Sequence, residues 1–376
     1  MDKKRIIEDN PQSPQLERRE AYFWICPPSS GILEIKDEAG LVTQLSKRQM
    51  IFPEDFMRGL GLSKKRLLLN NSEITRDFLK TVALFKQNRG IASNSPYALQ
   101  TNPLKRRVWD KFKKKDLCTN LFLKAQKGKM TAIMGNSGCG KSVFIKMLAG
   151  CNTTSQGDIY VFGTPLAEMM NHVAYVPQGD VLIPELTGRS SLNYTLRLSA
   201  PYLTAAERQL VINHVIRSLD LKSEVLDLQI GCPEWQGKFP SGGQRRRINL
   251  AHELVRFPEI IILDEPTSGL SASDAEKVIS VLKKLADSHE MTVISSIHSP
   301  NSVIFNMFND LLLVGSRGRI CYYGPAQDSW SFVMGGAFGS PDDLINAMER
   351  PEQEDALAKN YDYYMTNNIK ASLYYP

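Results

Sequence analysis

One glycine-rich segment combines the residue types that bind phosphate groups. Its members are, in order, Gly135, Asn136, Ser137, Gly138, Cys139, Gly140, Lys141 and Ser142. Glycines, which lack Cβ, let successive backbone N–H groups point at phosphate oxygens, and a following helix adds its positive N-terminal end. We expect Lys141 to neutralise charge on the β- and γ-phosphates of ATP and the Ser142 hydroxyl to ligate Mg²⁺. Cys139 occupies a variable position of this nucleotide-binding pattern, so we assign it no catalytic role.

The segments on either side of this loop fit a strand and a helix. Residues 131–134 form an apolar run, and residues 143–148 have helical spacing. A phosphate-binding P-loop requires this order of strand, loop and helix. A glycine-rich turn with a purely structural role is the alternative for this segment taken alone.

A second candidate is an acidic pair at the end of an apolar run. Residues 260–263 are followed directly by Asp264 and Glu265. Four large apolar residues in a row suit a central parallel strand buried on both faces, and such strands present ligands at their carboxyl ends. We expect Asp264 to bind Mg²⁺ directly or through a Mg²⁺ ligand, and Glu265 to orient and polarise the attacking water. A carboxylate pair that only caps a helix is the alternative, and the P-loop upstream argues against it.

The elements that position these residues follow from the pattern between about residues 101 and 325. Short apolar runs there alternate with helical segments, which predicts an α/β fold with a mostly parallel sheet. The runs at 130–134, 173–176, 260–263 and 292–297 are the predicted buried strands. No internal repeat is visible, so we expect one such unit.

Three further motifs resemble those of the ABC (ATP-binding cassette) ATPases, in the family's order and with its spacing. Gln178 resembles the Q-loop glutamine, and His298 resembles the switch histidine that contacts the γ-phosphate. The residues that resemble the signature loop are Ser241, Gly242, Gly243 and Gln244. Longer strings at 186–189, 264–270 and 304–326 resemble the G subfamily (white-type). The resemblance covers about residues 105–330.

The resemblance implies a P-loop NTPase (RecA-like) core with a parallel sheet, an ABC-type helical subdomain at about 180–250 and a small antiparallel β part. It implies that Gln178, Glu265 and His298 are catalytic, and that Ser142, Gln178 and Asp264 hold Mg²⁺. Phe112 stands at the position where the family has the aromatic residue that stacks on adenine, and Trp109 is the alternative for this role. Residues 241–244 would contact the ATP of a second domain, because the family binds two ATP molecules between two head-to-tail domains.

The resemblance also implies a function, the ATP-hydrolysing part of a transmembrane transporter. Its substrate would be hydrophobic or amphipathic, such as a lipid, sterol or pigment precursor. Its partners would be a second ABC ATPase domain, in a homo- or heterodimer, and a transmembrane domain on the same or a separate chain. The ATPase domain would be membrane-associated, on the cytoplasmic side.

Two other functions remain open. A soluble ABC ATPase in translation or nucleic-acid handling is the main alternative. The chain has neither two ATPase units nor an inserted coiled coil, so no nucleic acid is expected as a partner. A scaffold that binds ATP without hydrolysing it is disfavoured by Glu265 and His298.

Composition and charge exclude several classes of protein. The 376 residues are 42% hydrophobic and 23% charged, with a net charge of +6. No run of ~18 apolar residues that could span a bilayer occurs, and the charged N-terminus is not that of a secretory signal. A truncated transporter is the favoured expectation. Six scattered cysteines without a Cys-x-x-Cys pair disfavour a disulfide framework or a zinc site.

The remaining segments give further predictions. Residues 1–100 are an N-terminal extension with an amphipathic helix at 74–85, residues 101–330 the ATPase domain, and residues 331–376 a partly ordered linker, with weak order expected beyond about 340. The basic run from 105 to 115 is either a solvated surface or a contact for acidic headgroups or nucleic acid. Arg245, Arg246 and Arg247 are interpreted as a solvated helix start, or else as a partner-binding patch. Ser271 replaces the aspartate usual in the family's loop between active sites, which puts coupling across a dimer in doubt.

Overall fold

The computed structural model describes residues 95–110, 113–232 and 236–374, and the backbone of four short strands before them. These strands form two antiparallel pairs, β1 (Ile32–Lys36) with β2 (Val42–Ser46) and β3 (Gln49–Met50) with β4 (Leu67–Leu68). The amphipathic helix predicted at 74–85 lies outside the described residues, as does Phe112. By its contacts the chain divides into two units, Met1–Gly90 with Ala200–Val211, and Ile91–Ser199 with Ile212–Pro376. All the candidate site residues belong to the second unit.

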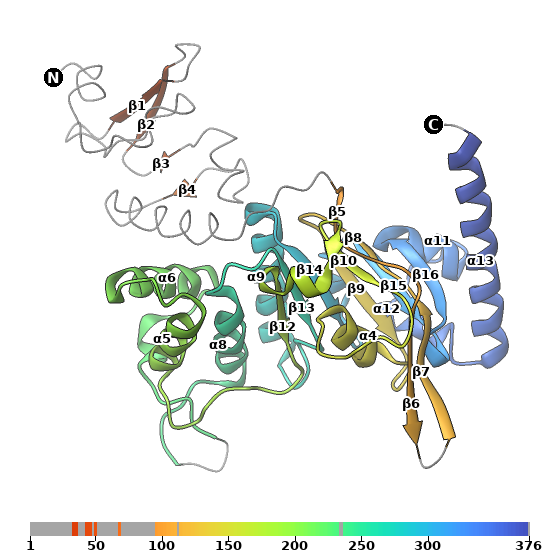
Figure 1. The fold of residues 1–376 in the computed structure, drawn as a ribbon, viewed down its shortest axis with the longest axis horizontal. Helices are drawn as coiled ribbons and strands as arrows, with labels where there is room; N and C mark the ends of the chain where they lie inside the picture. Colours follow the sequence, from red (N-terminus) through yellow and green to blue (C-terminus); the bar gives the residue numbers. More distant parts are fainter. Residues whose placement is uncertain are drawn as a thin grey trace. The chain divides into compact units, whose positions relative to one another are not determined.

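A six-stranded sheet forms the centre of the second unit (Figure 1). Its order is β12 (Val173–Val176), β13 (Ile260–Leu263), β14 (Thr292–Ser296), β9 (Met130–Gly135), β15 (Asp310–Val314) and β16 (Ile320–Pro325). The first five strands are parallel, and β16 is antiparallel to β15. The predicted α/β fold with a mostly parallel sheet is therefore confirmed, and the four predicted buried strands are β9, β12, β13 and β14.

Both faces of this sheet are covered, which explains the consecutive apolar residues in its strands. All four residues of β13 are fully buried. Alternate side chains, such as Ile260 and Ile262, pack in one core with helix α4 (Lys141–Leu148). Helices α8 (Gly242–Leu254) and α9 (Ala272–His289) pack against β12 and β14 respectively. A strand buried on both faces loses the polar–apolar alternation of a half-exposed strand.

A smaller antiparallel sheet shares the core around α4. Its order is β11 (Thr164–Pro165), β10 (Ile159–Val161), β5 (Tyr97–Thr101) and β8 (Lys124–Gln126). Leu99 and Val161 belong to the same hydrophobic core as Phe144, so α4 is packed between the two sheets. The predicted boundary at residue 100 falls inside β5, because a strand of 5 residues is too short to show a clear pattern. Strands β6 (Leu104–Asp110) and β7 (Lys113–Leu121) form a separate antiparallel hairpin, with Trp109 in β6.

The chain between β12 and β13 is mainly helical. Helices α5 (Gly188–Ser199), α6 (Ala205–Ser218) and α7 (Ser223–Leu226) precede α8, and α5 contacts both α7 and α8. The shorter helices elsewhere are η1 (Leu166–Glu168), η2 (Met170–His172), α10 (Ser302–Phe305), η3 (Ser316–Gly318) and η4 (Ala326–Asp328).

After β16 and η4, the described chain continues with three α-helices, namely α11 (Ser329–Met334), α12 (Pro341–Asn346) and α13 (Pro351–Tyr374). Helix α13 packs along β16 (Figure 1). The structure thus differs from the weak order predicted beyond residue 340. Glu354, Ala358 and Tyr361 recur at helical spacing and are buried on one face of α13. The acidic, tyrosine-rich composition concealed this pattern.

Candidate functional site

The glycine-rich loop connects β9 to α4 and is held between two neighbouring strands. Gly135, Gly138 and Gly140 have φ of 152°, 78° and 108°, conformations that favour glycine. A Cβ at position 135 would lie 2.1 Å from Val314 O, and a Cβ at position 140 would lie 2.8 Å from Leu117 O. The loop therefore needs glycine both for its backbone angles and for its close contact with β15 and β7.

Lys141 is buried and folds back over the loop. Its Nζ donates to Gly135 O at 2.7 Å and to Asn136 O at 3.0 Å. Ser137 and Gly138 are exposed at the tip of the same loop. The ammonium group and the backbone of the loop therefore lie within reach of one another, as phosphate binding requires.

Cys139 lies beside the lysine but is chemically quiet. Its Sγ is 4.0 Å from Lys141 Nζ. Burial raises the pKa of the thiol, although the nearby ammonium opposes this effect. A protonated, buried thiol is a poor nucleophile, which agrees with the absence of a catalytic role for Cys139.

The acidic pair lies next to the start of α4, at the carboxyl ends of the parallel strands. Ser142 Oγ donates to Asp264 Oδ1 at 3.0 Å. Ser296 Oγ, at the end of β14, donates to the same oxygen at 2.9 Å and accepts from the Glu265 N–H at 2.9 Å. Asp264 is buried. The structure therefore brings together Ser142 and both acids, which are far apart in the sequence.

Gln178 joins this group from the end of β12. Its Nε2 donates to Glu265 Oε2 at 2.8 Å. Glu265 has φ of 47°, a strained angle for a residue with a side chain, and the hydrogen bond to Ser296 holds its backbone there. The Glu265 carboxylate is thus oriented by both its side chain and its backbone.

His298 follows β14, which lies between β13 and β9 in the sheet. It is exposed, and its Nδ1 lies 3.1 Å from Ser299 Oγ. The strand order places His298 at the same edge of the sheet as Glu265, without a described hydrogen bond between the two side chains.

The residues present suit Mg²⁺ and a triphosphate. The Ser142 hydroxyl and the Asp264 carboxylate are hard oxygen donors that meet at 3.0 Å, and Mg²⁺ takes few protein ligands when phosphates supply the others. Gln178 uses its amide nitrogen on Glu265, which leaves its amide oxygen for a cation. The donor set therefore fits the predicted metal ligands.

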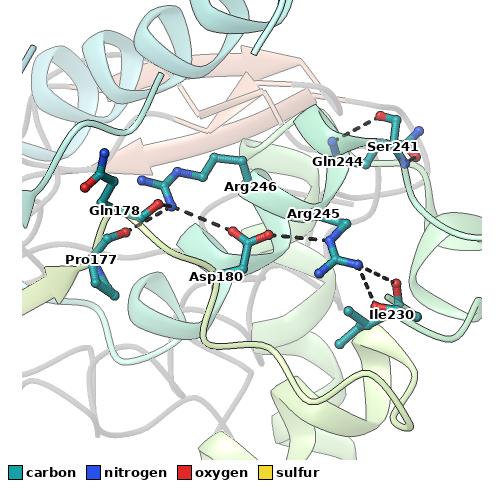
Figure 2. Close-up of polar contacts among 9 residues, drawn as sticks. Pro177, Gln178, Asp180, Ile230, Ser241, Gln244, Arg245 and Arg246 are labelled. Carbon is teal, nitrogen blue, oxygen red and sulfur yellow. Dashed lines mark hydrogen bonds and ion pairs between the residues drawn. The ribbon is translucent and has the colours of Figure 1, made fainter. Parts of the chain in front are cut away.

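The signature residues lie at the start of α8. Ser241 Oγ accepts from Gln244 N at 3.3 Å, and Gln244 Oε1 accepts from Ser241 N at 2.9 Å, a capping box (Figure 2). Gly242 and Gly243 form the first turn. None of the described hydrogen bonds joins these four residues to the P-loop or to the acidic pair. The signature residues are thus the part of the predicted site that the structure does not bring together with the rest.

The three arginines after the signature are not a solvated helix start, so that interpretation is wrong. Arg246 is 4% exposed and Arg247 9% exposed, and only Arg245 is partly open to solvent. Their guanidinium groups donate to backbone carbonyls of neighbouring loops. The helix period gave a signal for this: Arg246 and Arg247 precede the buried Leu250 and Ala251 by one turn and share their face.

Sequence reasoning missed Ser296 and Asp180 as well as Arg246. Ser296 stands in a strand whose five residues are all buried, where a hydroxyl needs a partner. Asp180 follows Gln178 by two positions and forms ion pairs with two of the arginines. A polar residue in a buried strand was the available signal for Ser296, and nothing local marked Asp180.

Comparisons with known proteins agree with this geometry. A family model described as ABC transporter matches residues 118–268. ABC transporter G family member 5 of Dictyostelium discoideum is 38% identical over 237 residues, 62% of this chain and 15% of that protein. The ABC transporter ATP-binding protein/permease wht-1 of Caenorhabditis elegans is 36% identical over 240 residues, 61% of this chain and 34% of that protein. The structure of cbiO1 from Clostridium perfringens, part of the ABC transporter complex cbiONQ, has a TM-score of 0.55 at 18% identity and covers 70% of this chain and 99% of cbiO1.

These comparisons concern one part of much longer relatives. This chain matches 15% of the first relative and 34% of the second. No helix in the described part of the chain is long and apolar enough to cross a membrane. Over the matched region, motifs, fold and sequence agree, and residues 118–268 therefore carry an ABC-type ATP-binding and ATP-hydrolysing domain, similar to the corresponding region of G-family transporters.

Proposed function

We propose that this chain supplies ATP hydrolysis to a G-type ABC transporter. The observation that carries the proposal is the hydrogen-bonded set of Ser142, Asp264, Ser296, Glu265 and Gln178. These residues come from the ends of four neighbouring elements and meet beside the phosphate-binding loop. Such an arrangement positions a water and a metal-bound triphosphate for in-line attack.

Hydrolysis follows from what each group can do. The loop N–H groups and Lys141 bind the phosphates of ATP. Ser142 and Asp264, with Gln178 adjacent, would hold Mg²⁺, which would neutralise charge at the phosphates when bound. Glu265 orients and polarises the attacking water, and Gln178 and Ser296 keep its carboxylate and backbone in place. His298 stands at the same edge to contact the terminal phosphate.

A dimer completes the site. Ser241, Gly242, Gly243 and Gln244 present the N-terminus of α8, which has 13 residues and favours an anion. These residues share no described hydrogen bond with the P-loop or the acidic pair of their own chain, which supports a role at the ATP of a second ABC domain. Whether that domain is the same chain or another one follows from the test below.

The transporter half of the proposal rests on the named relatives and on one surface feature. Val181 and Ile183, just after Gln178, are large apolar residues that are 67% and 53% exposed. Such residues beside the site suit an apolar contact with a membrane-embedded partner. The ATPase domain would then face the cytoplasm. The hydrophobic or amphipathic substrate, such as a lipid, sterol or pigment precursor, is proposed from the G-family likeness alone.

Two variants test the ATPase. Lys141→Ala should abolish nucleotide binding and turnover, because the loop loses its only lysine. Glu265→Gln should lower kcat by about 1,000-fold through loss of the general base and should trap an ATP-dependent dimer on a sizing column. Unchanged affinity and turnover in Lys141→Ala would refute ATP hydrolysis at this loop. A Glu265→Gln protein that stays monomeric with ATP would refute pairing between two copies of this chain and leave a different ABC domain as the partner.

A fractionation experiment separates the transporter from the soluble alternative. Val181→Asp with Ile183→Asp should release the full chain from membranes of its own cells. Val303→Asp, on α10 and also 53% exposed in its native form, is the matched control and should not release it. RNA that copurifies stoichiometrically with the wild-type chain, together with no membrane fraction, would instead support a soluble ABC ATPase.

A further inference from the structure

Arg246 is hydrogen-bonded to the loop that carries Gln178. It is buried in the second turn of α8, and its Nη1 donates to Pro177 O at 3.0 Å and to Gln178 O at 3.1 Å (Figure 2). Both acceptors are main-chain oxygens immediately after β12. The guanidinium therefore holds the backbone of the Q-loop, and the Gln178 side chain can donate its hydrogen bond to Glu265.

The remaining donors of the same guanidinium reach the acidic pair. Arg246 Nε donates to Pro266 O at 3.0 Å, and Nη2 lies within 3.4 Å of Asp264 O and 3.3 Å of Glu265 O. One planar group thus binds the backbones on both sides of the hydrogen bond between Gln178 and Glu265. Only arginine offers five donors in a rigid plane, whereas lysine offers a single point of attachment.

Asp180 holds this arginine in place and connects it to its neighbour. Its carboxylate lies 3.7 Å from Arg246 Nη1 and 3.4 Å from Arg245 Nε (Figure 2). Arg245 also donates to Ile230 O and Gly231 O, in the segment that leads to the signature residues. Without this carboxylate, the buried guanidinium would keep only neutral main-chain oxygens as hydrogen-bond partners, so Asp180 stabilises the whole arrangement.

We propose that Arg246 is a positioning residue for ATP hydrolysis, which sets the geometry of Gln178 and Glu265 through their backbones, and that Asp180 makes this geometry depend on α8. A shift of the Q-loop then moves Asp180, and Asp180 moves the helix whose first turn carries the signature residues. The inference rests on the proposed hydrolysis at Glu265. It assigns a task to two residues that contact neither the phosphates nor the water.

The experiment compares purified full chains in steady-state ATP turnover, with thermal unfolding measured alongside. Arg246→Gln should lower kcat by about 100-fold, the loss that a misplacement of about 1 Å causes, with the KM for ATP within about twofold. Asp180→Asn should lower kcat by about tenfold, as expected for the loss of one hydrogen-bonded ion pair. Asp180→Glu should restore part of that loss.

Asp227→Asn is the matched control. Asp227 accepts from Arg189 Nε at 2.7 Å, so the variant removes a similar ion pair between helices of the same region. It touches neither the Q-loop nor the acidic pair, and its kcat should equal that of the wild type. A role of Asp180 in stability alone would give Asp180→Asn the same unchanged kcat.

The outcomes separate this inference from the proposed function. Wild-type turnover that Lys141→Ala abolishes, combined with normal kcat in folded Arg246→Gln or Asp180→Asn, would overturn the positioning role and leave ATP hydrolysis intact. A fall in kcat that is accompanied by a fall in ATP affinity and in unfolding temperature in the same variant would also overturn the positioning role. No turnover in the wild type would overturn the proposed function and this inference with it. If Arg246→Gln does not fold, Asp180→Asn decides, because it leaves Arg246 in place.

Discussion

A single carboxylate oxygen organises the acidic side of the site at the scale of residues. Asp264 Oδ1 accepts from Ser142 and from Ser296, and the Ser296 hydroxyl also accepts from the Glu265 N–H. Each hydroxyl has one proton, so both protons are committed to the same acid. Ser296 therefore connects Asp264, the proposed metal-binding acid, with the backbone of Glu265, the proposed general base, although it would touch no substrate atom.

Replacement of Ser296 by alanine should slow hydrolysis without weakening ATP binding. The Glu265 N–H would lose its acceptor, and its strained backbone would lose one of its restraints. We expect a fall in kcat of about tenfold, since a lost hydrogen bond of this kind is worth about 1 kcal/mol or more. Ser295→Ala is the control, because Ser295 Oγ donates to Ser296 O and not to the acidic pair. Equal kcat values in the two variants would contradict the role given to Ser296.

His252 should make the fold less stable in acid. Burial between Ser191 and Thr195 lowers the pKa of this imidazole from 6.5 to about 4. Between these two pH values, His252 is protonated in the unfolded chain but stays neutral in the folded chain. Stability is therefore full above pH 6.5 and falls towards pH 4, by at most about 3 kcal/mol.

Unfolding temperatures between pH 7.5 and pH 4.5 check this effect. His252→Gln keeps polar groups for Ser191 and Thr195 but cannot titrate, so its unfolding temperature should fall less on acidification. Parallel pH curves for the wild type and the variant would show that His252 is not the group responsible.

At the scale of elements, the ends of short strands and the loops after them position the side chains of the site. The parallel pairing of β12, β13, β14 and β9 brings four carboxyl ends to one edge of the sheet. The glycine-rich loop is clamped there between β15 and β7. Ser271, at the place of the usual aspartate, caps α9 by accepting from Asp274 N at 3.2 Å, so the helix start is preserved.

Two glycines of the loop should differ sharply in their tolerance of alanine. Gly135→Ala puts a Cβ 2.1 Å from the backbone oxygen of Val314, so strand β15 would have to move. Gly138→Ala meets nothing within 4 Å and costs only the strain of its φ of 78°, about 1–2 kcal/mol. Urea unfolding should therefore show a much larger loss for Gly135→Ala, together with loss of ATP binding. Similar losses for both variants would contradict the clamped loop.

At the scale of the whole molecule, the C-terminal helix is part of the folded core. Tyr361 is 1% exposed, donates to Tyr323 O, and packs its ring against those of Tyr322 and Phe332. It also belongs to the core that contains α4. Helix α13 is thus connected, through β16 and this core, with the helix that follows the P-loop.

Replacement of Tyr361 should therefore destabilise the ATPase domain. Tyr361→Ala should reduce the free energy of unfolding by about 3–5 kcal/mol, as for other large buried aromatics. Tyr363 lies two positions away and is 72% exposed, so Tyr363→Ala should change it by no more than about 0.5 kcal/mol. A flexible linker would make both substitutions neutral, and denaturant titrations of the two proteins distinguish the cases.

Much of the nucleotide-binding core could be predicted from local patterns. The P-loop, the buried strands and the family likeness were predictable, because each depends on residue types at fixed spacing within a short segment. The spatial partners of those segments could be predicted only through the order of the motifs. The adenine-stacking role of Phe112 and the domain limits remain predictions.

Which polar groups meet could be read only from the packing of the elements. Asp180 and Arg246 are 66 positions apart in the sequence but adjacent in space, because β12 and α8 pack together. Likewise, Ser296 gains its role because β14 lies beside β13. Tyr361 is buried because α13 has β16 to pack against. Local patterns can show that a side chain needs a partner, but which distant segment covers it depends on how the elements pack.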